Sequence, residues 1–345
     1  MTAVILGLIV AVGLIEICLR IFGPPYYRFN NLSQEYYSNS RGYYDVIRVE
    51  NGRSIYGLDY HEDLNGFRVP ADPERWVVET PEKYILGLGD SFTYGRGVRY
   101  EDIYLTRLQE ILNRGSRRVS IKNCGVVGAG IQDVVDIYVR ESSTLPAGSL
   151  VMYGLVLNDF GLMTTEPIRG LNFIDINNGG YTYSPLRKHS AFVNFVFHAI
   201  ETRRLHTATL RAYLESFEGE NAENGFQLLG DLNEKIVDDG GTLLVVTFPL
   251  LYHFENYRFL SIHEKIATSC KEHGILILDL FPAFSRHSAR ELWSNPTDHH
   301  PNDIAHEIAA REIADFISDE VPDFLALPAT EPGAEGEHAD VPGRM

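Results

Sequence analysis

From residue 83 onward, short apolar runs alternate with longer stretches in which apolar residues recur every three or four positions. Short apolar runs that end at glycine, proline or polar residues are typical of buried strands, whereas the recurring pattern is typical of amphipathic helices. This alternation predicts five strands, at Tyr84–Leu88, Val119–Asn123, Leu150–Leu157, Thr242–Phe248 and Ile275–Leu280.

The longer stretches lie between these strands and after the last of them. Strands that alternate with helices of this length indicate βαβ units and a parallel sheet with helices on both faces. We therefore predict an α/β fold of three layers, α/β/α, around a central parallel sheet of about five strands. The predicted helices are Asp102–Asn113, Ile131–Ser142, Tyr257–His273 and Ile304–Ser318, with a longer one at His189–Phe217.

The N-terminus has a different pattern, because Ala3–Ile15 is apolar and carries no charge. Counting through Phe22 gives about the twenty residues that a membrane-spanning helix needs. The sequence shows neither the basic start nor the small-residue cleavage site of a secretory signal peptide. We therefore predict an uncleaved membrane anchor over residues 1–23, and a buried helix is the alternative.

The rest of the organisation follows from composition. Residues 24–82 are rich in Tyr, Asn, Arg and Gly without a sustained period, which indicates an irregular lead-in segment. Residues 83–326 hold the regular pattern, with an insertion at 161–217 whose helix is either a lid over the site or an extra packing layer. Proline, glycine and acidic residues dominate 327–345, which predicts a disordered tail.

Charge and cysteine content narrow the class of function. The 345 residues include 30 basic and 47 acidic side chains, so the net charge is −17. Such a surface repels phosphate backbones, and we expect no nucleic-acid partner. Three cysteines are too few for a disulfide framework, and no Cys/His spacing indicates zinc. We expect neither a metal nor a cofactor.

The stretch "YILGLGDSFTYGRGV", residues 84–98, joins an apolar strand to a glycine-rich loop. A dinucleotide fingerprint needs a third glycine where Phe92 stands, and a P-loop needs a lysine that does not follow. The α/β-hydrolase elbow G-x-S-x-G needs a glycine where Thr93 stands. A flavodoxin-like cofactor loop of hydroxyls and glycines stays open on residues 90–97 alone.

Four short blocks, which cover about residues 83–320, resemble the SGNH (GDSL-type) hydrolase family. "GDSFTYG" is similar to the family's opening block, and "NCGVVG" supplies the glycine that follows strand two. "YGLVLNDF" supplies Asn-Asp after strand three, and "TDHHPND" supplies Asp and His before the last helix. On these blocks the resemblance implies site residues at Ser91, Gly128, Asn158, Asp298 and His300, within an SGNH/flavodoxin-like fold.

The sequence departs from the family pattern at two places. Val156 stands where the third block usually has a glycine. The last block is often Asp-x-x-His, but here the histidine follows Asp298 by two positions. The neighbouring His299 is therefore the alternative to His300 as the base.

These residue types fit acyl transfer. A serine hydroxyl becomes a good nucleophile when a base takes its proton, and a neutral His300 imidazole can do this for Ser91. Asp298 would hold the other ring nitrogen and stabilise the imidazolium. The oxyanion would meet the backbone N–H of Ser91, the backbone N–H of Gly128 and the side-chain amide of Asn158.

The resemblance implies a serine esterase or acylhydrolase that acts on carboxylic esters through an acyl-serine intermediate. O-deacetylation of carbohydrate is the narrower expectation. The alternatives are an O-acyltransferase on glycans with the same triad and a catalytically silent binding module on the same fold. The expected partners are an acylated small molecule or carbohydrate, and the membrane through the N-terminal helix.

Two indications conflict on which side of the membrane the main domain lies. Arg20, Arg28 and Arg41 follow the apolar segment, and by the positive-inside rule they place the main domain in the cytoplasm. A role on polysaccharides places it outside. We expect a single-pass protein with an extracytoplasmic catalytic domain.

Overall fold

The computed structural model describes residues 2–22, 36–39, 42–45, 54–55, 58–161, 189–295 and 298–326. The predicted tail at 327–345 lies outside these residues, as does 162–188, the loop part of the predicted insertion.

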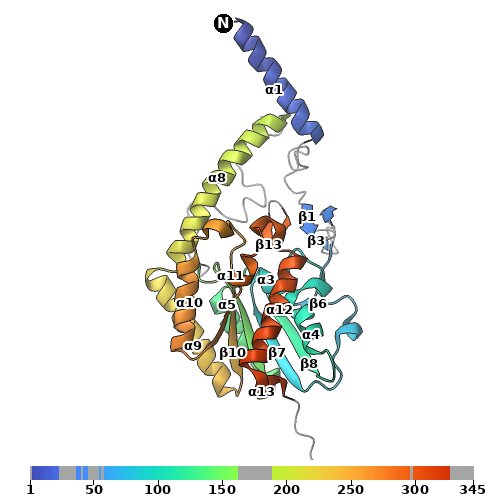
Figure 1. Ribbon diagram of the computed structural model, residues 1–345, viewed down its shortest axis with the longest axis vertical. Coiled ribbons are helices and arrows are strands. Elements are labelled where there is room, and N and C mark those ends of the chain that lie inside the picture. Colours follow the sequence, from blue (N-terminus) through green and yellow to red (C-terminus); the bar gives the residue numbers. More distant parts are fainter. Residues whose placement is uncertain are drawn as a thin grey trace, which may run out of the picture.

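A five-stranded parallel sheet forms the centre of the molecule, as predicted. Its order is β11-β10-β9-β7-β8, so the first strand of the sheet, β7, lies inside it rather than at an edge (Figure 1). In a sheet of this order, chains leave β7 and β9 in opposite directions, and ligands bind beyond the carboxyl ends at that point. The strands are β7 (Lys83–Gly89), β8 (Val119–Gly125), β9 (Leu150–Val156), β10 (Thr242–Phe248) and β11 (Leu276–Asp279).

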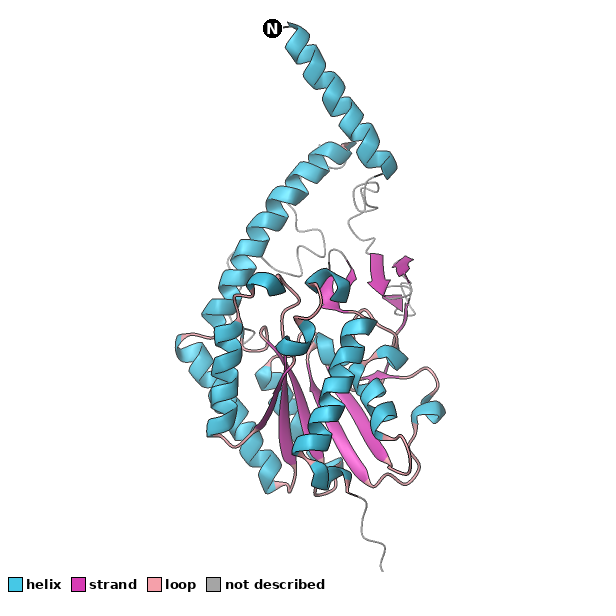
Figure 2. Ribbon diagram, in the orientation of Figure 1, coloured by secondary structure: helices cyan, strands magenta, loops and turns pink. Residues whose placement is uncertain are grey.

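Helices cover both faces of the sheet, which confirms the three-layer prediction (Figure 2). One face carries α4 (Tyr104–Leu112) and α12 (Asp303–Glu320), which pack against each other. The other carries α5 (Ile131–Glu141), α9 (Gly219–Asp238) and α10 (Leu260–Glu272).

The remaining helices include α1, which extends away from this core, and α8, which connects α1 to it (Figure 1). The α-helices are α1 (Thr2–Phe22), α3 (Ser91–Tyr94), α8 (Ala191–Ser216), α11 (Phe281–Phe284) and α13 (Pro322–Leu325). The 3₁₀ turns are η1 (Pro73–Trp76), η2 (Tyr100–Asp102), η3 (Ser142–Thr144), η5 (Phe254–Asn256) and η6 (Ala289–Leu292).

Short antiparallel strands pair outside the central sheet. They are β1 (Tyr36–Asn39) with β2 (Gly42–Asp45), β3 (Ser54–Ile55) with β4 (Leu58–Asp59), β5 (His61–Glu62) with β6 (Arg68–Val69), and β12 (Trp293–Asn295) with β13 (Asp298–Pro301).

Two helices differ from the prediction by more than two residues. Helix α10 begins at Leu260, three residues after the predicted start, because the backbone of Tyr257 is extended after the 3₁₀ turn at Phe254–Asn256. Helix α9 was not predicted at all. Its buried positions have helical spacing but include small residues, and Gly225 lies directly against the Phe160 ring.

The outer edge of β8 is covered by side chains of α4 and of Asn113, the residue that follows it. Asn113 accepts a hydrogen bond from Val119 N at 2.6 Å and donates one to Val119 O at 2.9 Å. Gln109 accepts from Ile121 N at 2.7 Å. Because these amides take the place of a sixth strand, the edge is not left open for pairing with another chain.

Candidate active site

Ser91 is the first residue of α3, directly after β7. The helix begins here because the Asp90 carboxylate caps it, accepting a hydrogen bond from Phe92 N at 2.8 Å. It ends after one turn at Gly95, which has φ +80°. Ser91 is mostly buried but lies at the carboxyl edge of the sheet, beside the point where β7 and β9 diverge.

Three glycines in register give α3 its seat on the sheet. Gly89 of β7 pairs with Gly125 of β8 on one side and with Gly154 of β9 on the other. A Cβ on Gly125 would lie 2.3 Å from Tyr94 N, and one on Gly154 would lie 2.5 Å from Thr93 Oγ1. The absence of side chains at these three positions therefore lets the turn that carries Ser91 pack directly on the strands.

His300 reaches Ser91 from the β12–β13 hairpin. Its Nε2 lies 2.8 Å from Ser91 Oγ, and its ring lies 5.6 Å from the Phe92 ring between centroids. The neighbouring His299 stacks instead on Trp293, with ring centroids 3.9 Å apart and planes 12° apart. Of the two candidate bases, the structure therefore brings His300 to the serine.

Asp298 lies two residues before His300 in β13, where its backbone pairs with Asn295. The Asp298 side chain lies outside the described part of the chain, so its predicted contact with His300 stays a prediction.

Asn302 fastens this hairpin to α12. Its side-chain oxygen caps the helix by accepting from Ile304 N and Ala305 N, each at 3.1 Å. Its amide donates to Glu291 O at 2.7 Å and to Trp293 O at 3.3 Å. One buried side chain thus provides hydrogen-bond partners both for the N–H groups at the start of α12 and for the carbonyls of Glu291 and Trp293. This explains the asparagine of the "DHHPN" motif.

Asn158, after β9, points its amide toward the serine turn. Its Nδ2 donates a hydrogen bond to Asp90 Oδ2 at 3.0 Å, and the same oxygen lies 3.4 Å from Ser91 Oγ. Burial raises the pKa of the Asp90 carboxyl, and the hydrogen bonds from Asn158 and Phe92 N oppose that rise. Asp90 therefore fixes the direction of the Asn158 amide as well as capping α3.

Gly128 lies in the loop after β8, at the same carboxyl edge. The loop turns through a hydrogen bond from Ala129 N to Val126 O, and Gly128 has φ +81°, which glycine adopts without strain. Val126 N donates to Gly89 O at 3.0 Å, which ties this loop to the start of the serine turn.

Two buried residues near the site were not assigned a role from the sequence. The Asp159 carboxyl accepts from Tyr153 OH at 2.8 Å and from Val156 N at 3.1 Å, and burial raises its pKa well above the usual value. Arg68 donates to the carbonyl oxygens of Gly95 and Val98, and so holds the loop after Ser91. Arg68 stands between Phe67 and Val69 in the irregular lead-in segment, where no sustained pattern predicts that its charged side chain is buried.

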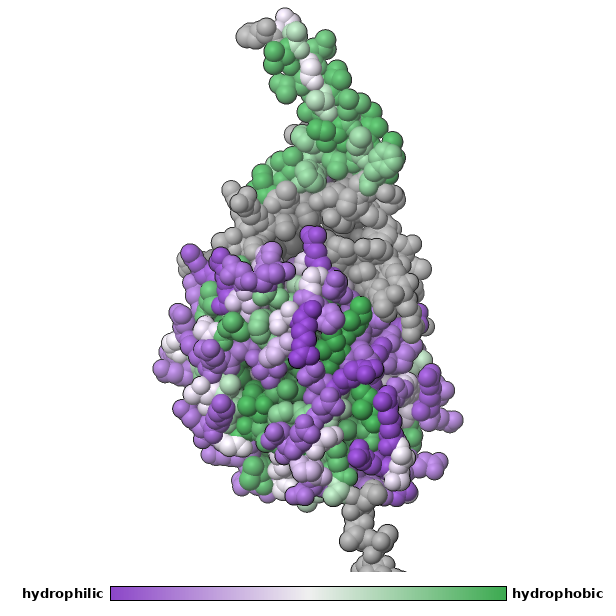
Figure 3. Space-filling model, in the orientation of Figure 1, coloured by the Kyte–Doolittle hydropathy of each residue, from purple (hydrophilic) through white to green (hydrophobic). Residues whose placement is uncertain are grey.

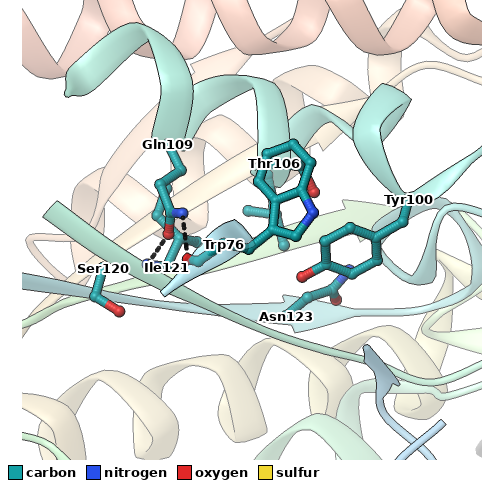
Figure 4. Close-up of a pocket in the computed structure, with 8 residues that line it drawn as sticks. Trp76, Tyr100, Thr106, Gln109, Ser120, Ile121 and Asn123 are labelled. Atoms are coloured by element: carbon teal, nitrogen blue, oxygen red, sulfur yellow. Dashed lines mark hydrogen bonds between the residues drawn. The ribbon is translucent and has the colours of Figure 1, made fainter. Parts of the chain in front are cut away.

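A small pocket lies elsewhere, against the edge strand β8 (Figure 4). Its volume is about 50 Å³, which suffices for a few water molecules but not for a sugar ring. Among the described residues, no group of three or more His, Cys, Asp or Glu side chains is placed to hold a metal ion. The pocket is lined by Trp76, Tyr100, Leu105, Thr106, Gln109, Ser120, Ile121 and Asn123.

Residues 88–308 match the model of the GDSL-like lipase/acylhydrolase family. No curated protein matches the chain.

Several solved structures are similar to it. A lipolytic protein of the G-D-S-L family from Veillonella parvula has 13% identity over 69% of this chain and 99% of that chain, with a TM-score of 0.42. The psychrotrophic esterase EstA from Pseudoalteromonas sp. has 12% identity over 70% and 100%, with a TM-score of 0.44. An acetylxylan esterase from Geobacillus stearothermophilus has 16% identity over 70% and 96%, with a TM-score of 0.43.

Proposed function

The chain belongs to the GDSL-like lipase/acylhydrolase family and is an ester-bond hydrolase, and from this premise we propose that Ser91 is its nucleophile. In this proposal His300 is the general base, Asp298 orients it, and carboxylic esters are cleaved through an acyl-serine intermediate. The observation that carries the proposal is the 2.8 Å approach of His300 Nε2 to Ser91 Oγ.

The steps follow from that contact. His300 Nε2 takes the Ser91 hydroxyl proton as Oγ attacks the ester carbonyl carbon, and a tetrahedral oxyanion forms. His300 then returns the proton to the alcohol oxygen as the carbon–oxygen bond of the ester breaks. Water attacks the acyl-serine with His300 again as base, and the free acid leaves while Ser91 regains its proton.

The oxyanion needs donors that are already in place. We assign this role to Ser91 N, Gly128 N and Asn158 Nδ2, as the sequence predicted. The support is that all three follow neighbouring strands at one edge of the sheet, and that Asp90 holds the Asn158 amide in a fixed direction. Such preorganised donors typically lower the barrier by roughly 3–4 kcal/mol each.

The proposal also keeps α1 as an uncleaved membrane anchor. Its 21 residues are long and apolar enough to cross a membrane. A cleaved signal peptide passes the same test, but Glu16 of α1 accepts hydrogen bonds from the start of α8, a contact that cleavage would remove. The side of the membrane on which the catalytic domain lies stays a prediction, which reporter fusions test. Carbohydrate O-deacetylation and acyl transfer to a glycan also stay predictions, which product analysis tests.

The proposed nucleophile is tested by labelling with a fluorophosphonate. We expect wild type to be labelled at Ser91, with a matching mass increase on the peptide that contains it, and Ser91→Ala to stay unlabelled. Thr93→Ser, which keeps a hydroxyl on the same turn, is the matched control and should still be labelled at Ser91. A labelled Ser91→Ala protein would contradict the assignment.

A further inference from the structure

The long helix α8 is capped by a residue from α1. The first backbone N–H groups of a helix have no partner within that helix. Here the Glu16 carboxylate accepts from Ala191 N at 2.9 Å and from Phe192 N at 2.7 Å. It also accepts from the Ser190 hydroxyl at 2.8 Å. The two helices are therefore joined by specific hydrogen bonds at one corner.

Arg20 completes this corner one turn further along α1. Its Nε donates to Glu16 at 2.6 Å, and a second guanidinium nitrogen donates to His189 O at 2.8 Å. Charged groups are costly in the hydrocarbon of a bilayer but are tolerated at the headgroup level, especially when paired. The corner therefore marks the level at which α1 leaves the hydrocarbon.

Apolar side chains continue from α1 past the corner and onto α8. The first turns of α8 expose 37% of Phe197 and 48% of Ile200, which lie three positions apart on one face of the helix, and 39% of Phe195 on another side of it. Figure 3 shows the apolar surface running from α1 around to the start of α8, whereas the surface of the domain below carries many hydrophilic residues. An apolar helix face next to a membrane span, at headgroup level, is typical of an interfacial helix.

The other end of α8 is fixed to the catalytic domain. Tyr213 packs edge-on against Phe259, with ring centroids 6.1 Å apart. Phe217, directly after the helix, stacks on Phe160 at 4.7 Å. With its 26 residues, α8 is about 39 Å long, so it acts as a rigid strut between the corner and the domain.

The strut sets which end of the domain faces the corner. Along the long axis of the molecule, α3 and β13, which carry Ser91 and His300, lie at the end of the sheet nearer to α1 and the start of α8 (Figure 1). Helix α13 lies at the opposite end.

We propose that the first turns of α8 rest on the lipid bilayer beside α1, so that Ser91 and His300 face the membrane and act on esters carried by membrane-associated molecules. The chemistry in this inference rests on the proposed function. The bilayer contact rests on the corner, the exposed apolar residues of α8 and their continuity with α1.

Lipid contact is tested by quenching of a fluorophore in the full chain, reconstituted into phosphatidylcholine/phosphatidylglycerol vesicles that contain nitroxide-labelled lipid. Single cysteines replace Ile9, Phe197 and Glu215 in turn, in a Cys18→Ser background; the native Cys124 and Cys270 are buried. We expect quenching at positions 9 and 197 and none at 215, which lies on the same helix about 27 Å further along.

Quenching at 9 without quenching at 197 overturns the α8 contact, and so does burial of position 197 in a dimer detected by size-exclusion chromatography. Absence of quenching at position 9 overturns the anchor, and the inference with it.

Substrate delivery is tested by kinetics of the same full chain. The double variant Phe195→Glu/Phe197→Glu should hydrolyse soluble p-nitrophenyl acetate like wild type, but should act roughly tenfold more slowly on an acetyl ester of a long-chain alcohol embedded in the vesicles. Arg211→Glu, on the far half of α8, is the matched control and should match wild type on both.

Equal losses on both substrates, or no loss on the embedded ester, would overturn membrane delivery. Failure of the proposed function gives a different result, because Ser91→Ala would then still hydrolyse the soluble ester. The quenching pattern does not depend on that activity, so it tests the bilayer contact separately.

Discussion

His300 Nε2 and Ser91 Oγ lie 2.8 Å apart, although 209 positions separate the two residues in the chain. Ser91 is placed by the sheet, through the glycines under α3. His300 is placed by the β12–β13 hairpin, which the Asn302 side chain joins to the start of α12. The contact therefore depends on two separate pieces of structure, and each can be perturbed without the other.

Loss of the Asn302 side chain should loosen the hairpin. Asn302→Ala removes a helix cap, which typically costs about 1 kcal/mol, and leaves the carbonyls of Glu291 and Trp293 without their donor. We expect lower stability in urea unfolding and lower kcat on p-nitrophenyl acetate. Asn302→Asp restores the cap but not the donor, so it should recover stability more than kcat; equal recovery of both would argue against a positioning role.

Asp90→Asn should disturb the Asn158 amide. An asparagine at position 90 can accept from Phe92 N or from Asn158 Nδ2, but in either orientation its own NH₂ faces the other donor. Because Asn158 is a proposed oxyanion donor, we expect kcat to fall by about 10²-fold with KM little changed. Steady-state kinetics test this, and an unchanged kcat would show that Asp90 does not position the Asn158 amide for catalysis.

A methyl group on Gly125 should displace the serine turn. Its Cβ would lie 2.3 Å from Tyr94 N, a backbone atom that cannot move away alone. We expect Gly125→Ala to destabilise the protein by about 1–3 kcal/mol and to lower esterase activity. Gly115→Ala is the control, because its Cβ meets nothing within 4 Å and only its φ of +91° costs about 1 kcal/mol. Equal effects of the two variants on activity would refute the packing argument.

His306 should make the protein sensitive to acid. Burial lowers the pKa of His306 from 6.5 to about 3, and its Nδ1 accepts a hydrogen bond from Tyr104 N. The unfolded chain therefore binds one proton more than the folded protein between these values, so the free energy of unfolding falls as the pH drops through this window. The slope from this group is about 1.4 kcal/mol per pH unit.

Urea unfolding at pH 6 and pH 4 measures this effect. His306→Asn keeps an acceptor for Tyr104 N but cannot take up the proton, so its stability should fall less between the two pH values than that of wild type. An identical fall in both proteins would show that other groups carry the acid sensitivity.

The strands and the order of the site blocks were predictable because they depend on local pattern. Apolar runs such as Leu150–Val156 are buried on both faces of the sheet, so burial leaves a clear signal in the sequence. Helix α9 gave no such signal, because close packing on Phe160 requires a glycine at 225, and glycine weakens a helical pattern.

Contacts between distant segments could not be predicted in this way. The hydrogen bond from Asn158 to Asp90 joins two loops that meet only once β7 and β9 pair. Which of His299 and His300 reaches Ser91 depends on which of the two rings stacks on Trp293. A motif that contains both histidines does not predict this.

The most direct test of the central claim compares His300→Ala with His299→Ala in hydrolysis of p-nitrophenyl acetate. His300→Ala should lower kcat by at least about 10³-fold, because Ser91 loses its base. His299→Ala removes a ring from Trp293 but not from Ser91, and it should retain most of the activity. Loss of activity in His299→Ala together with retention in His300→Ala would contradict the account.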